Sequence, residues 1–228
     1  MIVLQSPQFA TQDDTGRGDG IAPIAQWLEV ANYYQETVSP LCDTPGLDPA
    51  IHDISRRLRM LFHEPERFEM STTDFHDLAC FILHRLIDRT SYTTYSDETP
   101  PRSTSESVRH AIALYLLIIH GPTYFSHARL QYTITLQLKA HLEDSLASLF
   151  LSNGSLALWL LSVGMVASEG TSDRQWFTSQ ARKVSITLGV YVWEEVLFHL
   201  KEILWLQNQQ AEHLFQQRWD GVWSVTAT

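Results

Sequence analysis

Apolar residues recur at helical spacing along almost the whole chain from Pro23 onward. Side chains three and four residues apart share one face of an α-helix, so this spacing predicts amphipathic helices. We find no sustained alternation of apolar and polar residues, which is the pattern of a half-buried strand. The sequence therefore predicts an all-α fold of about eight or nine helices, with a single domain over residues 23–225 and a flexible N-terminal tail over residues 1–22.

Local start and stop signals divide this domain into helices. Asp48-Pro49 supplies an N-cap and a first-turn proline for a helix that Pro65 ends. Gly121-Pro122 and Gly189 are typical of helix ends. Three further pairs have the spacing of a capping box and predict helix starts: Ser71 with Asp74, Ser103 with Glu106, and Ser172 with Gln175.

Residues 88–107 interrupt the helical pattern with polar side chains and two prolines. They predict a long polar loop, a kind of connection that is uncommon in compact domains and is often mobile or functional, for instance as a lid over a site. A disordered insertion is the more ordinary interpretation of the same residues.

The run from Leu156 to Ala167 contains no charged residue. Its twelve residues cover about 18 Å as a helix, well short of the roughly 30 Å of hydrocarbon in a bilayer. A helix that is apolar on all sides is enclosed by other helices, so we predict a central apolar helix over residues 156–168. Gly164 is expected to permit a close backbone approach there.

Composition narrows the class of protein. The chain has 228 residues, a net charge of −10 and only two cysteines, Cys42 and Cys80. The cysteine count fits a reducing compartment, and the N-terminus has no secretory pattern, so we expect an intracellular protein, cytoplasmic or nuclear. The sequence has no cluster of Lys and Arg residues that could bind the phosphate backbone of a nucleic acid. It also has no phosphate-binding or dinucleotide-binding motif. We therefore predict neither direct nucleic-acid binding nor a cofactor.

Four segments resemble the C-terminal helical regulatory region of fungal zinc-cluster transcription factors, in the order found in that family: residues 105–117, 156–177, 193–206 and 218–223. The matching features are an apolar Leu/Trp-rich helix, a Glu-Gly turn, a Trp-Phe helix start, and a Trp-Glu-Glu helix that leads to a Leu-Trp pair. They correspond to Leu158, Trp159, Leu160, Glu169, Gly170, Trp176, Phe177, Trp193, Glu194, Glu195, Leu204 and Trp205. The similarity covers residues 50–223.

The resemblance implies an α-helical region that responds to metabolites or partners. Members of that family carry a six-cysteine, two-zinc DNA-binding cluster, which two isolated cysteines cannot build. The DNA-binding part of the family's role therefore does not transfer. What remains is a regulator without its own DNA module, a co-regulator that pairs with a DNA-binding partner, or the same scaffold in another use.

Several histidine and aromatic side chains interrupt apolar helical segments. Taken singly, each of these residues is most simply a core or boundary residue, because histidine and aromatic side chains are commonly buried while they keep one hydrogen bond. Together they favour an aromatic-walled pocket for an apolar small molecule. The candidate ligand-binding residues are His84, His110, Tyr115, His120, Trp159 and Trp193.

Two clusters offer metal-ligating or nucleophilic groups. His76, Cys80 and His84 recur at four-residue intervals and share a helical strip, which could hold zinc or an activated thiol. The strip borders an apolar face, where an inert cysteine and two boundary histidines are ordinary. Glu195, His199 and Glu202 also share a face, but a solvated surface is the simpler interpretation. We predict no metal site and assign no catalytic residue.

Two classes of function remain open. The first is a helical protein of secondary metabolism that binds a hydrophobic small molecule or a regulator partner, with no membrane contact. The second is a cofactor-independent cyclase or isomerase, such as an intramolecular Diels–Alder catalyst, acting on a polyketide or terpenoid intermediate. Such a pocket would hold the substrate in its reactive conformation while a Tyr or His side chain hydrogen-bonds a carbonyl.

Overall fold

The computed structural model describes residues 11–12, 17, 20–32, 44, 46–87, 103–121 and 127–224. These residues form nine helices and no sheet, which confirms the predicted all-α class. The helices are α1 Ala25–Ala31, α2 Pro49–His63, α3 Thr72–Ile87, α4 Ser103–His120, α5 Ala128–Ser152, α6 Gly154–Ala167, α7 Arg174–Leu188, α8 Trp193–Ile203 and α9 Gln209–Ser224.

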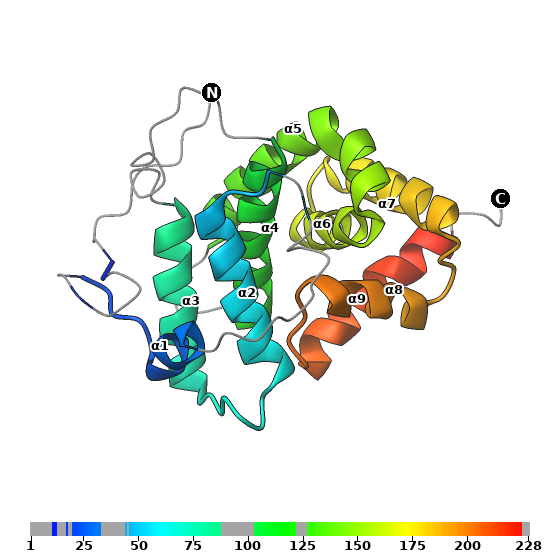
Figure 1. Cartoon of the computed structure of the whole chain (residues 1–228). Helices are drawn as coiled ribbons and strands as arrows, with labels where there is room; N and C mark the ends of the chain where they lie inside the picture. The colour runs from blue at the N-terminus through cyan, green and yellow to red at the C-terminus, as the bar shows by residue number, and fades with distance from the viewer. Residues whose placement is uncertain are drawn as a thin grey trace.

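The apolar helix α6 lies at the centre of the molecule, in contact with α4, α5, α7, α8 and α9 (Figure 1). Every side chain from Leu156 to Ala167 is buried, as predicted. The helix begins at Gly154, two residues before the predicted start, because the side chain of Asn153 accepts a hydrogen bond from the Leu156 N–H and caps it. Within the described ranges, no helix is both long enough and apolar enough to cross a membrane.

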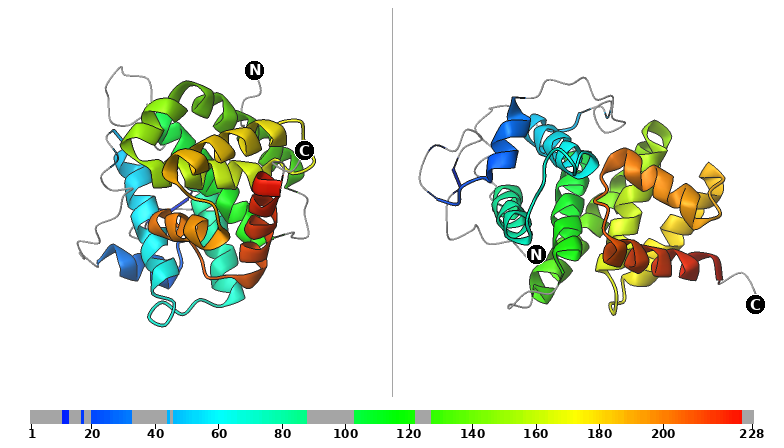
Figure 2. Two further views of the ribbon diagram at one scale, coloured as in Figure 1. Left: turned by 90° about the vertical axis from the view of Figure 1, so that its right-hand side faces the viewer. Right: turned by 90° about the horizontal axis from the view of Figure 1, so that it is seen from below.

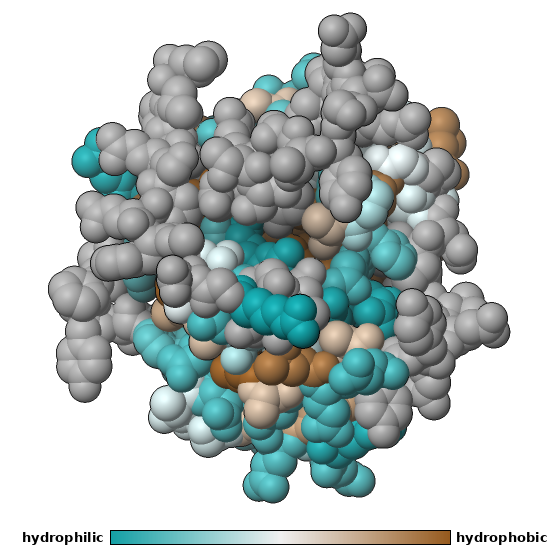
Figure 3. Space-filling view, turned by 60° about the vertical axis from the view of Figure 1, so that its left-hand side comes forward, coloured by the Kyte–Doolittle hydropathy of each residue, from teal (hydrophilic) through white to brown (hydrophobic). Residues whose placement is uncertain are grey.

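The other helices form two groups around this centre. Helices α1 to α3 lie on one side of α4, and α7 to α9 lie on the other side, around α6; Figure 2 shows this division from two further directions. Helix α5 packs against both α4 and α6. The coloured part of the face that carries the first group is mainly hydrophilic, with one small hydrophobic patch (Figure 3).

Two predicted helix starts are confirmed in detail. The Asp48 carboxylate accepts hydrogen bonds from the Ala50 and Ile51 N–H groups at the start of α2. At the start of α3, the Ser71 hydroxyl accepts from the Asp74 N–H (3.1 Å) while the Asp74 carboxylate accepts from the Ser71 N–H (2.9 Å). This exchange is a reciprocal capping box.

Helix α4 begins at Ser103, the residue predicted to start it, but the polar groups of that pair have other partners. The Ser103 hydroxyl donates to the His141 carbonyl (2.8 Å), and the Glu106 carboxylate pairs with Arg109. Helix α7 starts after Asp173, whose carboxylate binds Lys139 (2.8 Å) and makes no cap. The predicted pair of Ser172 and Gln175 therefore does not define that start.

The predicted loop and tail need smaller corrections. Residues 103–107, assigned to the end of the loop at 88–107, belong to α4, while 88–102 lie outside the described residues. Most of the predicted tail, 1–22, is also outside them. Ile21 nevertheless packs against the core, and its carbonyl accepts from the Gln12 N–H (3.0 Å), so Ile21 belongs to the folded body.

Candidate functional site

The six predicted ligand-binding residues fall into separate neighbourhoods. His110, Tyr115 and His120 follow one another along α4, and ten residues of helix separate the first from the last by about 15 Å. The structure brings Tyr115 and Trp159 together, with ring centroids 5.8 Å apart. It places His110 beside His141 and His120 beside His76, so the set does not line one pocket.

Tyr115 and Trp159 hold the non-helical segment that follows α8. The Tyr115 hydroxyl accepts a hydrogen bond from the Leu206 N–H (2.9 Å), and the Trp159 indole donates to the Leu204 carbonyl (2.9 Å). Both side chains are fully buried, and burial raises the pKa of Tyr115 far above its ordinary value. The polar atoms of these two side chains are therefore already hydrogen-bonded, to an N–H and a carbonyl that lie outside any helix and have no helical partner.

Trp193 joins the same aromatic cluster through Trp205. The two indole rings meet edge to face with centroids 6.4 Å apart, and Trp205 lies 6.2 Å from Tyr115. The indole N–H groups of Trp193 and Trp205 are buried and have no hydrogen-bond partner within the described part of the chain. They are the unused donors of this cluster, so a ligand role for Trp193 stays a prediction.

Glu106, His110 and His141 place their ligand atoms within 4.8 Å of one another, which is the arrangement of a possible metal centre. The guanidinium of Arg109 already serves as the cation there: Nη2 pairs with the Glu106 carboxylate and lies 3.0 Å from His110 Nε2. Nη1 of the same side chain donates to the Leu86 carbonyl at the end of α3. A metal would have to displace this buried arginine, so we assign the cluster a structural role.

The environment of His110 keeps its ring neutral. Burial, followed by the positive charge of Arg109 and the neighbouring His141, lowers the pKa of His110 well below its ordinary value. Hydrogen bonds to Gln137 and to the Glu106 backbone raise the pKa of His110 by a smaller amount. The parallel stacking on His141, at 5.5 Å between centroids, completes the contact between α4 and α5.

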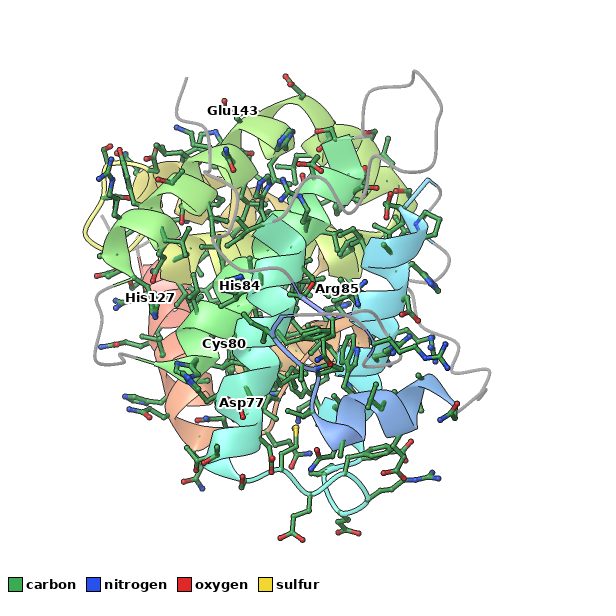
Figure 4. All side chains as sticks on the ribbon, turned by 90° about the vertical axis from the view of Figure 1, so that its left-hand side faces the viewer. Asp77, Cys80, His84, Arg85, His127 and Glu143 are labelled. Carbon is green, nitrogen blue, oxygen red and sulfur yellow. The ribbon has the colours of Figure 1, made fainter. Side chains whose placement is uncertain are left out.

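The histidine–cysteine strip on α3 makes a contact that the sequence does not reveal. Nδ1 of His76 lies 2.8 Å from Nε2 of His120, and Sγ of Cys80 lies 3.6 Å from Nε2 of His76. Cys80 is half-buried, and Figure 4 labels it on α3 together with Asp77 and His84. His84 is outside this chain of contacts, and its Nδ1 is buried without a hydrogen-bond partner among the described residues.

A serine, a histidine and a carboxylate meet where α6 begins beside α8. The Ser155 hydroxyl lies 2.8 Å from Nδ1 of His199 and donates to the Glu202 carboxylate (2.7 Å). A catalytic triad requires the serine and the carboxylate on opposite nitrogens of the imidazole, whereas here both meet Nδ1. The third member of the predicted face, Glu195, instead caps α8 through the Tyr191 N–H (2.8 Å).

A groove of about 360 Å³ runs between α5 and α7. Its lining combines aliphatic and aromatic side chains with polar ones: Leu142, Glu143, Leu146, Ala147, Phe150, Trp176, Gln180, Lys183, Val184 and Thr187. This volume falls in the range of small-molecule sites, which are mostly apolar with a few polar groups. The sequence pattern places Leu142, Trp176 and Val184 on inner helix faces but does not indicate a space between the two helices.

Comparison of the chain with protein-family models, with curated proteins and with solved structures gave no significant match. The resemblance to the regulatory region of zinc-cluster factors therefore rests on the quoted sequence segments alone.

Proposed function

We propose that the protein binds an apolar small molecule carrying a carboxylate, in the groove between α5 and α7. The observation that carries this proposal is the lining of the groove: an apolar floor, and at its rim the ammonium of Lys183, which has no ion-pair partner among the described residues. The floor and the rim each contribute one element of the recognition.

The apolar part of the groove accounts for affinity. Trp176 and Phe150 are half-buried and present aromatic surface from opposite helices, and Leu146 also lines the groove from α5. Each methylene group that leaves water contributes about 0.8 kcal/mol. A flexible chain of about ten carbons is thus enough for measurable binding in a groove of this size.

The charges at the rim favour an acid over an alcohol or an amine. Lys183 is exposed and makes no ion pair with any residue that the structure describes. The opposite charge, Glu143, faces Lys139 at 3.7 Å, and Lys139 is held by Asp173 at 2.8 Å. The acidic side of the rim is therefore partly neutralised, whereas the ammonium of Lys183 is available to a ligand carboxylate.

Within this proposal the protein acts as a ligand-responsive regulatory domain, the role that the sequence resemblance implies. The net charge of −10 supports a protein that does not contact nucleic acid by itself. The cyclase or isomerase alternative stays a prediction from the sequence, because the groove's polar side chains, Glu143, Gln180, Lys183 and Thr187, suggest orientation of a bound acid and no particular reaction.

The test is a titration of the purified protein with decanoate and with 1-decanol, followed by tryptophan fluorescence and by calorimetry. We expect decanoate to bind more tightly than the alcohol and to change the emission of Trp176. The Trp176→Phe variant should lose the fluorescence change, while Trp223→Phe, on α9, should keep it. Equal binding of acid and alcohol, or a signal that survives Trp176→Phe, would refute the proposed site.

A further inference from the structure

Cys80, His76 and His120 form a continuous relay where α3 packs on α4. The thiol of Cys80 meets Nε2 of His76 at 3.6 Å, and Nδ1 of the same ring meets Nε2 of His120 at 2.8 Å. Two imidazoles thus connect the sulfur atom of Cys80 on α3 to the end of α4.

With the proton of the neutral His120 ring on Nδ1, its Nε2 presents a lone pair to His76. His76 must then carry its proton on Nδ1, since a hydrogen bond needs one donor. Its Nε2 is consequently a free acceptor that faces the Cys80 thiol. Cys80 is therefore placed as a nucleophile, His76 as its base and His120 as the group that orients the base, which is the arrangement found in covalent catalysis.

The surroundings disfavour the charged forms of Cys80 and His120. Burial, followed by the nearby Asp77 carboxylate, raises the pKa of the Cys80 thiol. Burial, then His76 and His127, lowers the pKa of His120, against a smaller opposing effect of its bond to Gly121. The thiolate is therefore not formed in advance, and the proton moves to His76 as the sulfur reacts.

The position of Cys80 within α3 limits the electrophile. Backbone N–H groups in the middle of a helix are bonded to carbonyls one turn earlier, so none beside Cys80 can stabilise the oxyanion of an acyl transfer. Conjugate addition needs no such group. The exposed Asp77 carboxylate disfavours anionic reactants. We propose that Cys80 is a covalent capture site for neutral α,β-unsaturated carbonyl compounds, with His76 as its base and His120 as a positioning residue.

The step balances without any further reagent. Nε2 of His76 takes the thiol proton as Sγ of Cys80 bonds to the β-carbon, and the π electrons of the double bond move to the α-carbon and carbonyl as an enolate. The imidazolium then returns the proton to the α-carbon. One S–C bond and one C–H bond replace the S–H bond and the π bond, and the reverse elimination releases the compound.

This site is separate from the groove between α5 and α7. In Figure 4 the label of Glu143, which lines the groove, lies at the top of the molecule on α5, away from Cys80 on α3. No residue belongs to both sites, so either proposal can fail without the other.

The experiment measures the rate at which N-ethylmaleimide adds to the protein, with Cys42→Ser in every variant so that Cys80 is the remaining cysteine. Peptide mapping locates the adduct, and the rate is followed by mass spectrometry between pH 5.5 and 9. We expect His76→Leu to lower the rate at pH 7 at least tenfold. The profile of the parent should contain an inflection below that of the thiol, which His76→Leu lacks.

Matched variants separate the relay from a general effect of neighbouring histidines. His84→Leu, one turn to the other side of Cys80, should stay within twofold of the parent. His120→Leu should lower the rate several-fold, and His120→Gln should restore most of it because its amide oxygen can accept from His76. Circular dichroism and urea unfolding of each variant verify that it is folded, so the rates compare folded proteins. Equal rates for the parent and His76→Leu would overturn the proposal.

Discussion

The ring of Phe177 lies directly on the α-carbon side of Gly164, with no room for a side chain between α6 and α7. A β-carbon on Gly164 would stand 2.2 Å from Cε1 of Phe177, far inside van der Waals contact. The sequence predicts a close backbone approach at this glycine, whereas the group that approaches it is the Phe177 side chain. Phe177 also meets Trp176 edge to face at 4.9 Å, which links the centre of the core to the groove between α5 and α7.

Gly164→Ala should destabilise the protein by roughly 1–3 kcal/mol, because the fully buried Phe177 ring must move to admit the methyl group. Urea unfolding measures the change. Gly221→Ala is the matched control: its β-carbon meets no atom within 4 Å in helix α9, so the substitution should be neutral or stabilising by about 0.5–1 kcal/mol. Equal effects of the two substitutions would contradict the packing described for Gly164.

Lys183→Met should weaken decanoate binding up to about fivefold, since an exposed ion pair contributes up to about 1 kcal/mol. Binding of 1-decanol should change little, because methionine keeps the apolar stem. Lys201→Met, at an exposed position on α8, should leave both affinities as they are. Calorimetry of the two ligands with the three proteins checks this, and a parallel loss of acid and alcohol binding would count against a charge interaction.

Tyr115→Phe should lower the free energy of unfolding by about 1–3 kcal/mol, because the Leu206 N–H then loses the acceptor that it has among the described residues, in a largely buried segment. The measurement is urea unfolding combined with hydrogen exchange of the Leu206 amide, which should accelerate. A ligand role for Tyr115 predicts the opposite result, with weaker binding and unchanged stability.

Stability should fall on acidification because of His110. Its pKa is lowered in the folded state, so the unfolded chain binds the proton first as the pH drops below about 6.5. The contribution is present above that pH and is lost progressively below it. Unfolding free energies measured between pH 7.5 and pH 5 should decrease less steeply in His110→Gln than in the parent. Parallel slopes would show that His110 is not the group responsible.

The sequence pattern predicts those elements whose signals are local. Leu156 to Ala167 is free of charge, and that alone places its helix in the interior. The Ser71 and Asp74 pair caps α3 because the two residues bond to each other across the first turn. Ser103 and Asp173 have side chains equally suited to capping, but they bind His141 and Lys139 from α5. Their partners depend on how helices cross, which local spacing does not contain.

The candidate sites are less predictable for the same reason. His76 and His120 are 44 positions apart, and only the packing of α3 on α4 brings their rings together. The strip of His76, Cys80 and His84 is visible in the sequence, whereas the orienting second imidazole is not. The groove likewise arises from the separation of α5 and α7. Helical periodicity predicts which face of each helix is buried, but it does not predict the distance between two helices.

The bonds from Tyr115 and Trp159 to the segment after α8 have a consequence for biosynthesis. They join positions 91 and 45 residues apart, so the residues of α4 and α6 are translated before Leu204 and Leu206. In a nascent chain, the side of the aromatic cluster that faces this segment therefore stays uncovered until these two residues have been added. We conclude that chains stalled before Leu204 would expose this apolar surface to chaperones and proteases.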